Sequence, residues 1–189
     1  MTDNIREFSM LTRRTFVQGS LFLLASSFPA RADLYDDYIN SVSKQPFVSF
    51  FARDDTLTGH AFVALGTELD NGLTVYEGIF GYYPADSGKM TIIKTFVGTK
   101  GIVTFKENDY PSKIRYRKNV DDETKEKAKA VLSAWTSNDP KYALFGNGGK
   151  NCNALVKEIA EAIGLNTPSD NPSSTFPENY IRKLKEANP

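Results

Sequence analysis

Short blocks of β-branched and aromatic residues follow one another between residues 46 and 106, separated by glycines and polar turns. Such blocks are typical of β-strands, whose side chains alternate between the two faces of a sheet. The pattern therefore predicts a series of strands, closed by a last alternating segment. The predicted strands are 47–51, 60–65, 73–76, 91–97, 102–105 and 114–117.

The segment Asp70-Asn71-Gly72 separates two of these blocks and is a strong turn signal. We therefore predict a β-hairpin over residues 60–83, with a two-residue turn formed by Asn71 and Gly72. Residue 70 then lies opposite residue 73, so the numbers of paired residues add up to 143 along the whole hairpin. Every side chain of the two strands is assigned to a face by this register.

The hydrophobic period changes to between three and four after residue 120, which is typical of helices. Acidic residues open the first predicted helix, 121–135, where they lie at the positive end of the helix dipole. A second helix is predicted from Asn151 to Ile163, capped by Gly164, and a short one at 180–186. Strands followed by helices predict one α+β domain with a mostly antiparallel sheet.

The N-terminus has the three-part layout of an export signal. Residues 12–18 (Thr-Arg-Arg-Thr-Phe-Val-Gln) form a twin-arginine pattern, an apolar stretch follows from Phe16 to Phe28, and Ala30-Arg31-Ala32 supplies small residues for cleavage. We therefore predict a twin-arginine (Tat) signal peptide at 1–32 and a mature domain at 33–189, periplasmic or secreted. An uncleaved anchor is the alternative, but a membrane span needs about 20 apolar residues.

The amino-acid composition limits the partners, disulfides and metal sites that the chain can have. The chain of 189 residues has 23 basic and 23 acidic residues, one cysteine and one histidine. Balanced charge gives no broad basic surface for nucleic acid, so we expect no nucleic-acid partner. One cysteine forms no internal disulfide, and one cysteine with one histidine cannot enclose a structural zinc ion. We expect neither a metal nor another cofactor, and the oligomeric state stays open.

Cys152 is the strongest candidate for chemistry. It lies in the first turn of a predicted helix, between Asn151 and Asn153, where unpaired backbone N–H groups and the helix dipole stabilise a thiolate. The same N–H groups can hold an oxyanion that forms on an attacked carbonyl. Lys150 adds positive charge nearby. The alternative is an inert cysteine that fills a gap in the core.

His60 is the only imidazole, so any cysteine–histidine pair includes it. As a general base it would complete the chemistry of a thiol at a helix start. A third group normally orients the imidazole. The predicted register places Tyr83 opposite His60 and Glu77 opposite Gly66, which favours Tyr83 as this third group. A bulge would reopen the case for Glu77.

In chain order these motifs resemble the circularly permuted branch of the NlpC/P60 superfamily, which includes lecithin–retinol acyltransferase-like proteins. The resemblance rests on Gly59-His60-Ala61-Phe62-Val63, Phe80-Gly81-Tyr82-Tyr83-Pro84, Tyr142-Ala143-Leu144-Phe145-Gly146 and Asn151-Cys152-Asn153-Ala154-Leu155-Val156. It implies a papain-like fold with an antiparallel sheet packed against the cysteine-bearing helix. It also implies that Cys152 is the nucleophile, that His60 is the base, and that Tyr142 supports the oxyanion site.

These observations predict an exported cysteine hydrolase that cleaves an amide by a Cys–His mechanism. The predicted compartment makes a peptide substrate from peptidoglycan the first expectation, and an acyl lipid the second. The rival hypothesis is a non-catalytic ligand- or lipid-binding module on the same fold. In that case Phe80 and Tyr82, rather than the cysteine, would carry the function.

Overall fold

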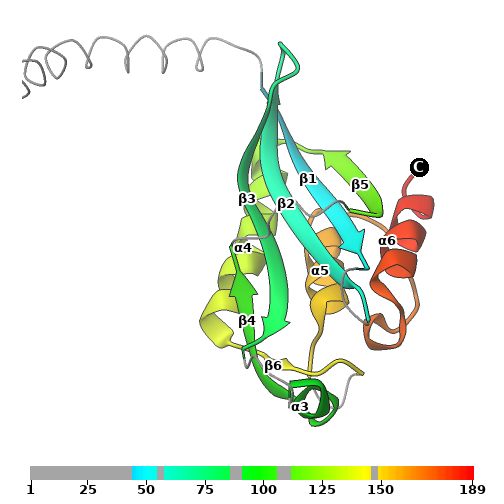
Figure 1. Cartoon of the computed structure of the whole chain (residues 1–189). Coiled ribbons are helices and arrows are strands. Elements are labelled where there is room, and N and C mark those ends of the chain that lie inside the picture. The colour runs from blue at the N-terminus through cyan, green and yellow to red at the C-terminus, as the bar shows by residue number, and fades with distance from the viewer. Residues whose placement is uncertain (1–43, 55–57, 86–90, 106–111, 146–148) are drawn as a thin grey trace, which may run out of the picture. The chain divides into compact units, whose positions relative to one another are not determined.

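The computed structural model describes residues 44–54, 58–85, 91–105, 112–145 and 149–189 (Figure 1). The predicted signal peptide at 1–32 and the start of the predicted mature domain lie outside the described residues. No helix within the described residues is long and apolar enough to cross a membrane.

Six strands form one antiparallel sheet in the order β5-β1-β2-β3-β4-β6 (Figure 1). β1 and β2 lie inside the sheet and are its most deeply buried strands, which explains their nearly continuous apolar sequences. The strands are β1 Lys44–Arg53, β2 His60–Leu69, β3 Thr74–Pro84, β4 Thr99–Thr104, β5 Ile114–Asn119 and β6 Lys141–Tyr142.

The α-helices of the described residues are α3 Thr91–Val97, α4 Asp122–Asn138, α5 Cys152–Ala162 and α6 Pro177–Glu186, with a short 3₁₀ helix η1 at Pro172–Ser174. The predicted α+β class with an antiparallel sheet is therefore confirmed. The predicted strand at 91–97 is wrong, because this segment is a helix. Its β-branched residues favour a strand only weakly, and Gly98, with φ +91°, provides the left-handed residue that commonly ends a helix.

The β2–β3 hairpin is confirmed, but its turn differs from the prediction. Leu69 and Leu73 pair through the Leu69 N–H, which donates to the Leu73 carbonyl at 2.9 Å, so three residues rather than two form the loop. Gly72 has φ +80°, as a three-residue hairpin loop requires. Close to the turn, the numbers of paired residues therefore add up to 142, as in Glu68 and Thr74.

A β-bulge between Leu65 and Gly66 shifts the register back. Leu65 pairs with Gly78 and Gly66 pairs with Tyr76, so Glu77 is the extra residue of the bulge. The prediction that Glu77 lies opposite Gly66 is therefore wrong. Beyond the bulge the paired numbers add up to 143, as predicted, and Phe62 pairs with Gly81.

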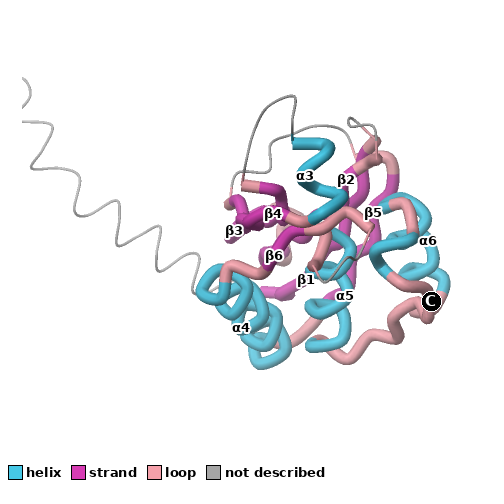
Figure 2. The backbone as a smooth tube through the Cα atoms, turned by 90° about the horizontal axis from the view of Figure 1, so that it is seen from below, coloured by secondary structure: helices cyan, strands magenta, loops and turns pink. Residues whose placement is uncertain are grey.

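The helices α4, α5 and α6 cover one face of the sheet (Figure 2). Alternate residues of β1 and β2, such as Phe50 and Val63, pack there against the apolar sides of the three helices. Leu132 and Trp135 of α4 and Leu155 of α5 are among the buried residues. This packing fixes the start of α5 against β2, which is the arrangement on which the site depends.

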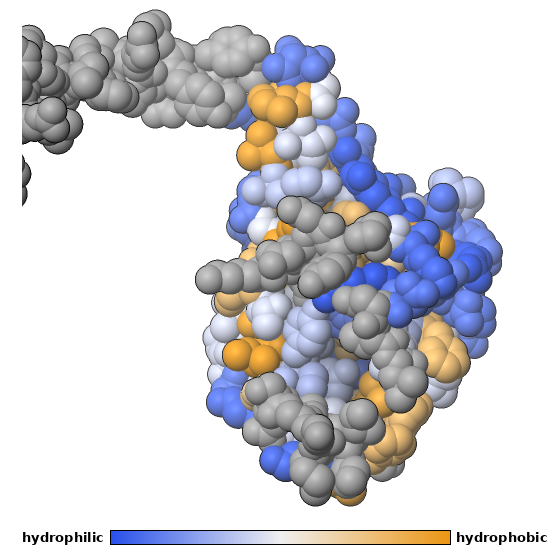
Figure 3. All heavy atoms as spheres, in the orientation of Figure 1, coloured by the Kyte–Doolittle hydropathy of each residue, from blue (hydrophilic) through white to orange (hydrophobic). Residues whose placement is uncertain are grey.

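Exposed apolar side chains gather at the end of the β2–β3 hairpin, where Leu73, Val75 and Tyr76 are each more than two-fifths exposed (Figure 3). A second exposed apolar group comprises Phe96 and Val97 of α3 and Phe145. The rings of Phe96 and Phe145 lie in contact, with centroids 5.2 Å apart.

Candidate active site

Cys152 is the first residue of α5, and the preceding residue caps the helix. Asn151 has extended backbone angles (φ −123°, ψ −174°), and its Oδ1 accepts a hydrogen bond from the Ala154 N–H at 3.1 Å. This is the geometry of an asparagine N-cap. The predicted helix start is confirmed, and the thiol lies in the first turn as expected.

Cys152 and His60 lie in contact, although they come from different elements. Both are buried, and the thiol forms a hydrogen bond with the imidazole. Burial raises the pKa of Cys152, but the hydrogen bond and the charge of His60 lower it, as do backbone hydrogen bonds from Ala61 and Asn153, and the net pKa lies below its ordinary value. The site therefore favours a thiolate–imidazolium pair.

The start of α5 also offers backbone donors. The N–H of Cys152 belongs to the first helical residue, and within the described residues no hydrogen bond occupies it. Such a group can donate to an oxygen that becomes negative as the thiolate attacks its carbonyl. Lys150, in contrast, does not contribute the expected charge to the thiol. Its Nζ pairs with Glu158 and lies 4.7 Å from the ring centroid of Trp135.

His60 is held within a stack of aromatic rings. Its ring lies 4.1 Å from that of Tyr83 and 6.0 Å from that of Phe62, measured between centroids. Arg53, which pairs with His60 across β1 and β2, donates from Nη2 to the Tyr83 hydroxyl at 2.8 Å. The structure therefore places Tyr83 against His60 through its ring. That Tyr83 orients the imidazole of His60 stays a prediction. Ring stacking is the contact through which Tyr83 would do so.

Glu77, the alternative third group, is engaged elsewhere. Its carboxylate accepts from Lys125 at 2.6 Å and from Lys129 at 2.9 Å, both on α4. Burial raises the pKa of Glu77, but the hydrogen bonds and charges of the two lysines lower it by more, so the net pKa lies below its usual value. The hairpin does contain a bulge, which was the condition for Glu77 to act as the third group. The carboxylate of Glu77 nevertheless binds the two lysines of α4.

Tyr142 is buried on β6 near the thiol. Burial raises the pKa of Tyr142, and the negative charge of the Cys152 thiolate raises it further, so its hydroxyl stays protonated and can act as a donor. The predicted role beside the oxyanion is compatible with this position and stays a prediction. Tyr82 itself is fully buried against Trp135, and its hydroxyl donates to the Pro140 carbonyl. Tyr82 therefore belongs to the core.

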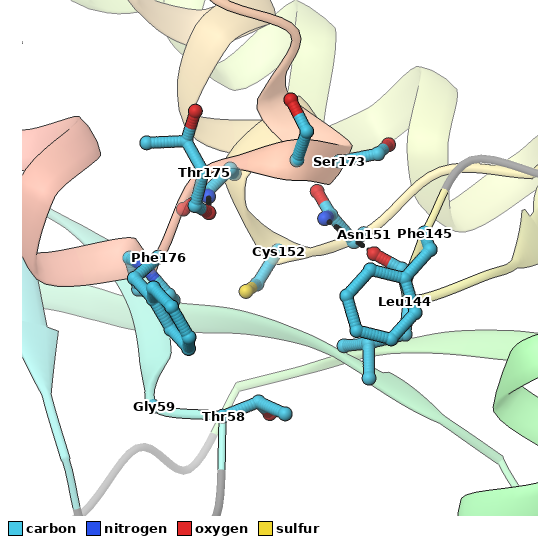
Figure 4. Close-up of a pocket in the computed structure, with 12 residues that line it drawn as sticks. Thr58, Gly59, Leu144, Phe145, Asn151, Cys152, Ser173, Thr175 and Phe176 are labelled. Atoms are coloured by element: carbon cyan, nitrogen blue, oxygen red, sulfur yellow. Dashed lines mark hydrogen bonds between the residues drawn. The ribbon is translucent and has the colours of Figure 1, made fainter.

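A small pocket of about 60 Å³, partly open to solvent, begins at Cys152 (Figure 4). The sulfur points into it, as Figure 4 shows. The pocket is lined by Thr58 and Gly59 before β2, by Leu144 and Phe145 after β6, and by residues 151–153 and 173–177.

The two asparagines beside Cys152 attach one wall of this pocket to the start of α5. The Nδ2 of Asn153 donates to the carbonyls of Pro172 and Thr175 at 3.0 and 2.7 Å. The Nδ2 of Asn151 donates to the Leu144 and Pro172 carbonyls at 3.1 and 3.3 Å. The sequence did not predict this wall, because residues 167–177 show no helical or strand-like hydrophobic period. The only available signal was the pair of amides flanking the cysteine.

Comparisons with protein-family models, with curated proteins and with solved structures found no match for this chain. Among the described residues, no group of three or more potential metal ligands lies together. Function is therefore inferred from the contacts of Cys152 and His60.

Proposed function

We propose that the protein is a cysteine hydrolase that cleaves an amide or an ester with Cys152 as nucleophile and His60 as base. The contact between the two side chains at the start of α5 carries this proposal. A histidine-bearing strand β2 that precedes a cysteine-bearing helix packed on an antiparallel sheet also supports a permuted papain-like fold of the NlpC/P60 type.

The reaction has two halves. The Cys152 thiolate, whose proton is already held by His60, attacks the carbonyl carbon, and the Cys152 N–H donates to the oxyanion. His60 then protonates the leaving amine or alcohol, the C–N or C–O bond breaks, and a thioester remains. Water attacks this thioester and gives a proton to His60, and the sulfur departs as the thiolate, which restores the starting pair. The net reaction consumes one water and releases an acid and an amine or alcohol.

The twin-arginine pattern points to a substrate outside the cytoplasm, because this route exports folded proteins. Stem peptides of peptidoglycan are therefore the first amide substrate to test, and acyl lipids are the first esters.

The test is to incubate purified sacculi and a set of acyl esters with wild type, Cys152→Ala and His60→Ala. The expected result is product release by wild type that Cys152→Ala abolishes and His60→Ala reduces at least hundredfold, in line with loss of a general base. Equal release by Cys152→Ala, or no release from any substrate, would contradict a hydrolase. Ligand binding that survives in Cys152→Ser would then favour the binding module.

A further inference from the structure

Apart from the Cys152 thiolate, the described residues that line the pocket carry no formal charge. Its side chains are apolar or neutral, and two of them are large exposed aromatics. Phe176 is 65% exposed and Phe145 is 53% exposed. In Figure 4 their rings lie on opposite sides of the Cys152 sulfur. Both rings therefore line the pocket into which the sulfur points.

Phe176 stands where the local structure favours a different residue. It is the N-cap of α6, with φ −62° and ψ 140°, and its side chain makes no capping hydrogen bond. Serine, threonine, aspartate and asparagine are preferred at this position because their side chains satisfy a free N–H. A phenylalanine here forgoes that bond and also exposes an apolar ring. Residues that break local rules in this way concentrate at functional sites.

Phe145 is supported from behind by Phe96 of α3, whose ring centroid lies 5.2 Å away. This contact limits the positions that the Phe145 ring can adopt. On the other side, Phe176 is followed by the buried Pro177, which fixes the backbone at the start of α6. The two rings thus come from distant parts of the chain, and both line the pocket at the thiol.

We propose that Phe145 and Phe176 form an aromatic clamp that selects an uncharged, apolar acyl group for transfer to Cys152. This inference rests on the proposed hydrolase function and narrows its substrate class. A carboxylate on the acyl group would leave water without gaining a charged partner, which is costly because the described lining of the pocket offers no cationic side chain. The clamp therefore disfavours acyl groups such as glutamyl, which carry a second carboxylate near the reacting carbonyl.

The experiment measures kcat/KM for nitrophenyl esters from acetyl to octanoyl, and for a glutaryl ester matched in length to the pentanoyl ester. Wild type is expected to prefer longer chains over acetyl, and pentanoyl over glutaryl by at least tenfold. Phe176→Ser and Phe145→Ser are expected to lose at least fivefold with octanoyl and less than twofold with acetyl. The control is Phe105→Ser, because Phe105 is 58% exposed but lines a different hollow beside Phe80.

Misfolding is tested separately. Serine is a better N-cap than phenylalanine, so Phe176→Ser is expected to raise Tm while it lowers the octanoyl rate. Equal rates for all chain lengths, or the same loss in Phe105→Ser, would overturn the clamp.

A second readout needs no turnover: the rate at which N-alkyl chloroacetamides of increasing chain length alkylate Cys152. A chain-length preference that Phe176→Ser removes supports the clamp even if no ester is hydrolysed, in which case only the hydrolase proposal fails. Alkylation rates that do not depend on chain length overturn the clamp.

Discussion

Asn151 connects the fold to the candidate site, and its two functions can be separated by substitution. Its Oδ1 caps α5 through the Ala154 N–H, and its Nδ2 donates to the carbonyls of Leu144 and Pro172. Asn151→Ser retains a capping oxygen but removes the two hydrogen bonds that the Nδ2 amide donates. Asn151→Ala removes the cap as well. The side chain is buried, so water does not easily replace the lost bonds.

The expected costs follow from these contacts. Loss of an N-cap costs about 1 kcal/mol, and each side-chain to backbone hydrogen bond contributes about 1 kcal/mol. Asn151→Ser is therefore expected to lower the free energy of unfolding by about 2 kcal/mol, and Asn151→Ala by about 3 kcal/mol. The difference of about 1 kcal/mol between the two variants isolates the cap.

Urea unfolding followed by the fluorescence of Trp135, the only tryptophan and a buried one, measures both variants. Equal costs for serine and alanine would refute the cap. Costs below about 0.5 kcal/mol in both would refute the attachment of the pocket wall, since surface substitutions fall in that range. Asn151→Ala should also slow alkylation of Cys152 at neutral pH more than Asn151→Ser does, because the frayed helix start no longer stabilises the thiolate.

Two further predictions concern charged groups. His60→Ala removes the largest contribution that lowers the pKa of Cys152, so the midpoint of the pH profile for alkylation by iodoacetamide should rise, and the rate at pH 7 should fall at least tenfold. Tyr83→Phe, which keeps the stacked ring, should leave this profile nearly unchanged, whereas an unaltered profile in His60→Ala would refute the pair. Glu77→Gln should lower the free energy of unfolding at pH 7 by about 1 kcal/mol, a value kept small because the carboxylate is about one-third exposed. Because the folded pKa of Glu77 lies below its unfolded value of about 4.3, its contribution is present above that pH and is lost as the pH falls, so wild type and Glu77→Gln should converge in acid urea titrations.

The sequence predicted α4 and α5 well because their starts are encoded locally. Asp121 and Asn151 each accept a hydrogen bond from the N–H three residues later, which is a contact between near neighbours. The segment 91–97 was mispredicted because its β-branched residues carry a weak preference that tertiary contacts override. Its helical form is tied to a distant part of the chain, since the Leu144 N–H donates to the Thr95 carbonyl.

The candidate site was predictable only in part. With one cysteine and one histidine in the chain, the pairing of Cys152 with His60 needed no knowledge of the fold. The pocket wall at 173–177 could not be found this way, because it is held by hydrogen bonds to Asn151 and Asn153 that span about twenty residues. No periodicity records such contacts.

The position of Tyr83 beside His60 depends on two deviations that offset each other. The three-residue loop alone would make paired numbers add up to 142 along the whole hairpin, and Tyr82 would then lie opposite His60. Opposite residues share a face, so the Tyr82 ring would leave the core, where it packs on Trp135 and Tyr142. The bulge at Glu77 restores the register, returns Tyr82 to the core and brings Tyr83 to the imidazole. The ion pairs that anchor Glu77 to α4 therefore support the geometry of His60 from the opposite half of the hairpin.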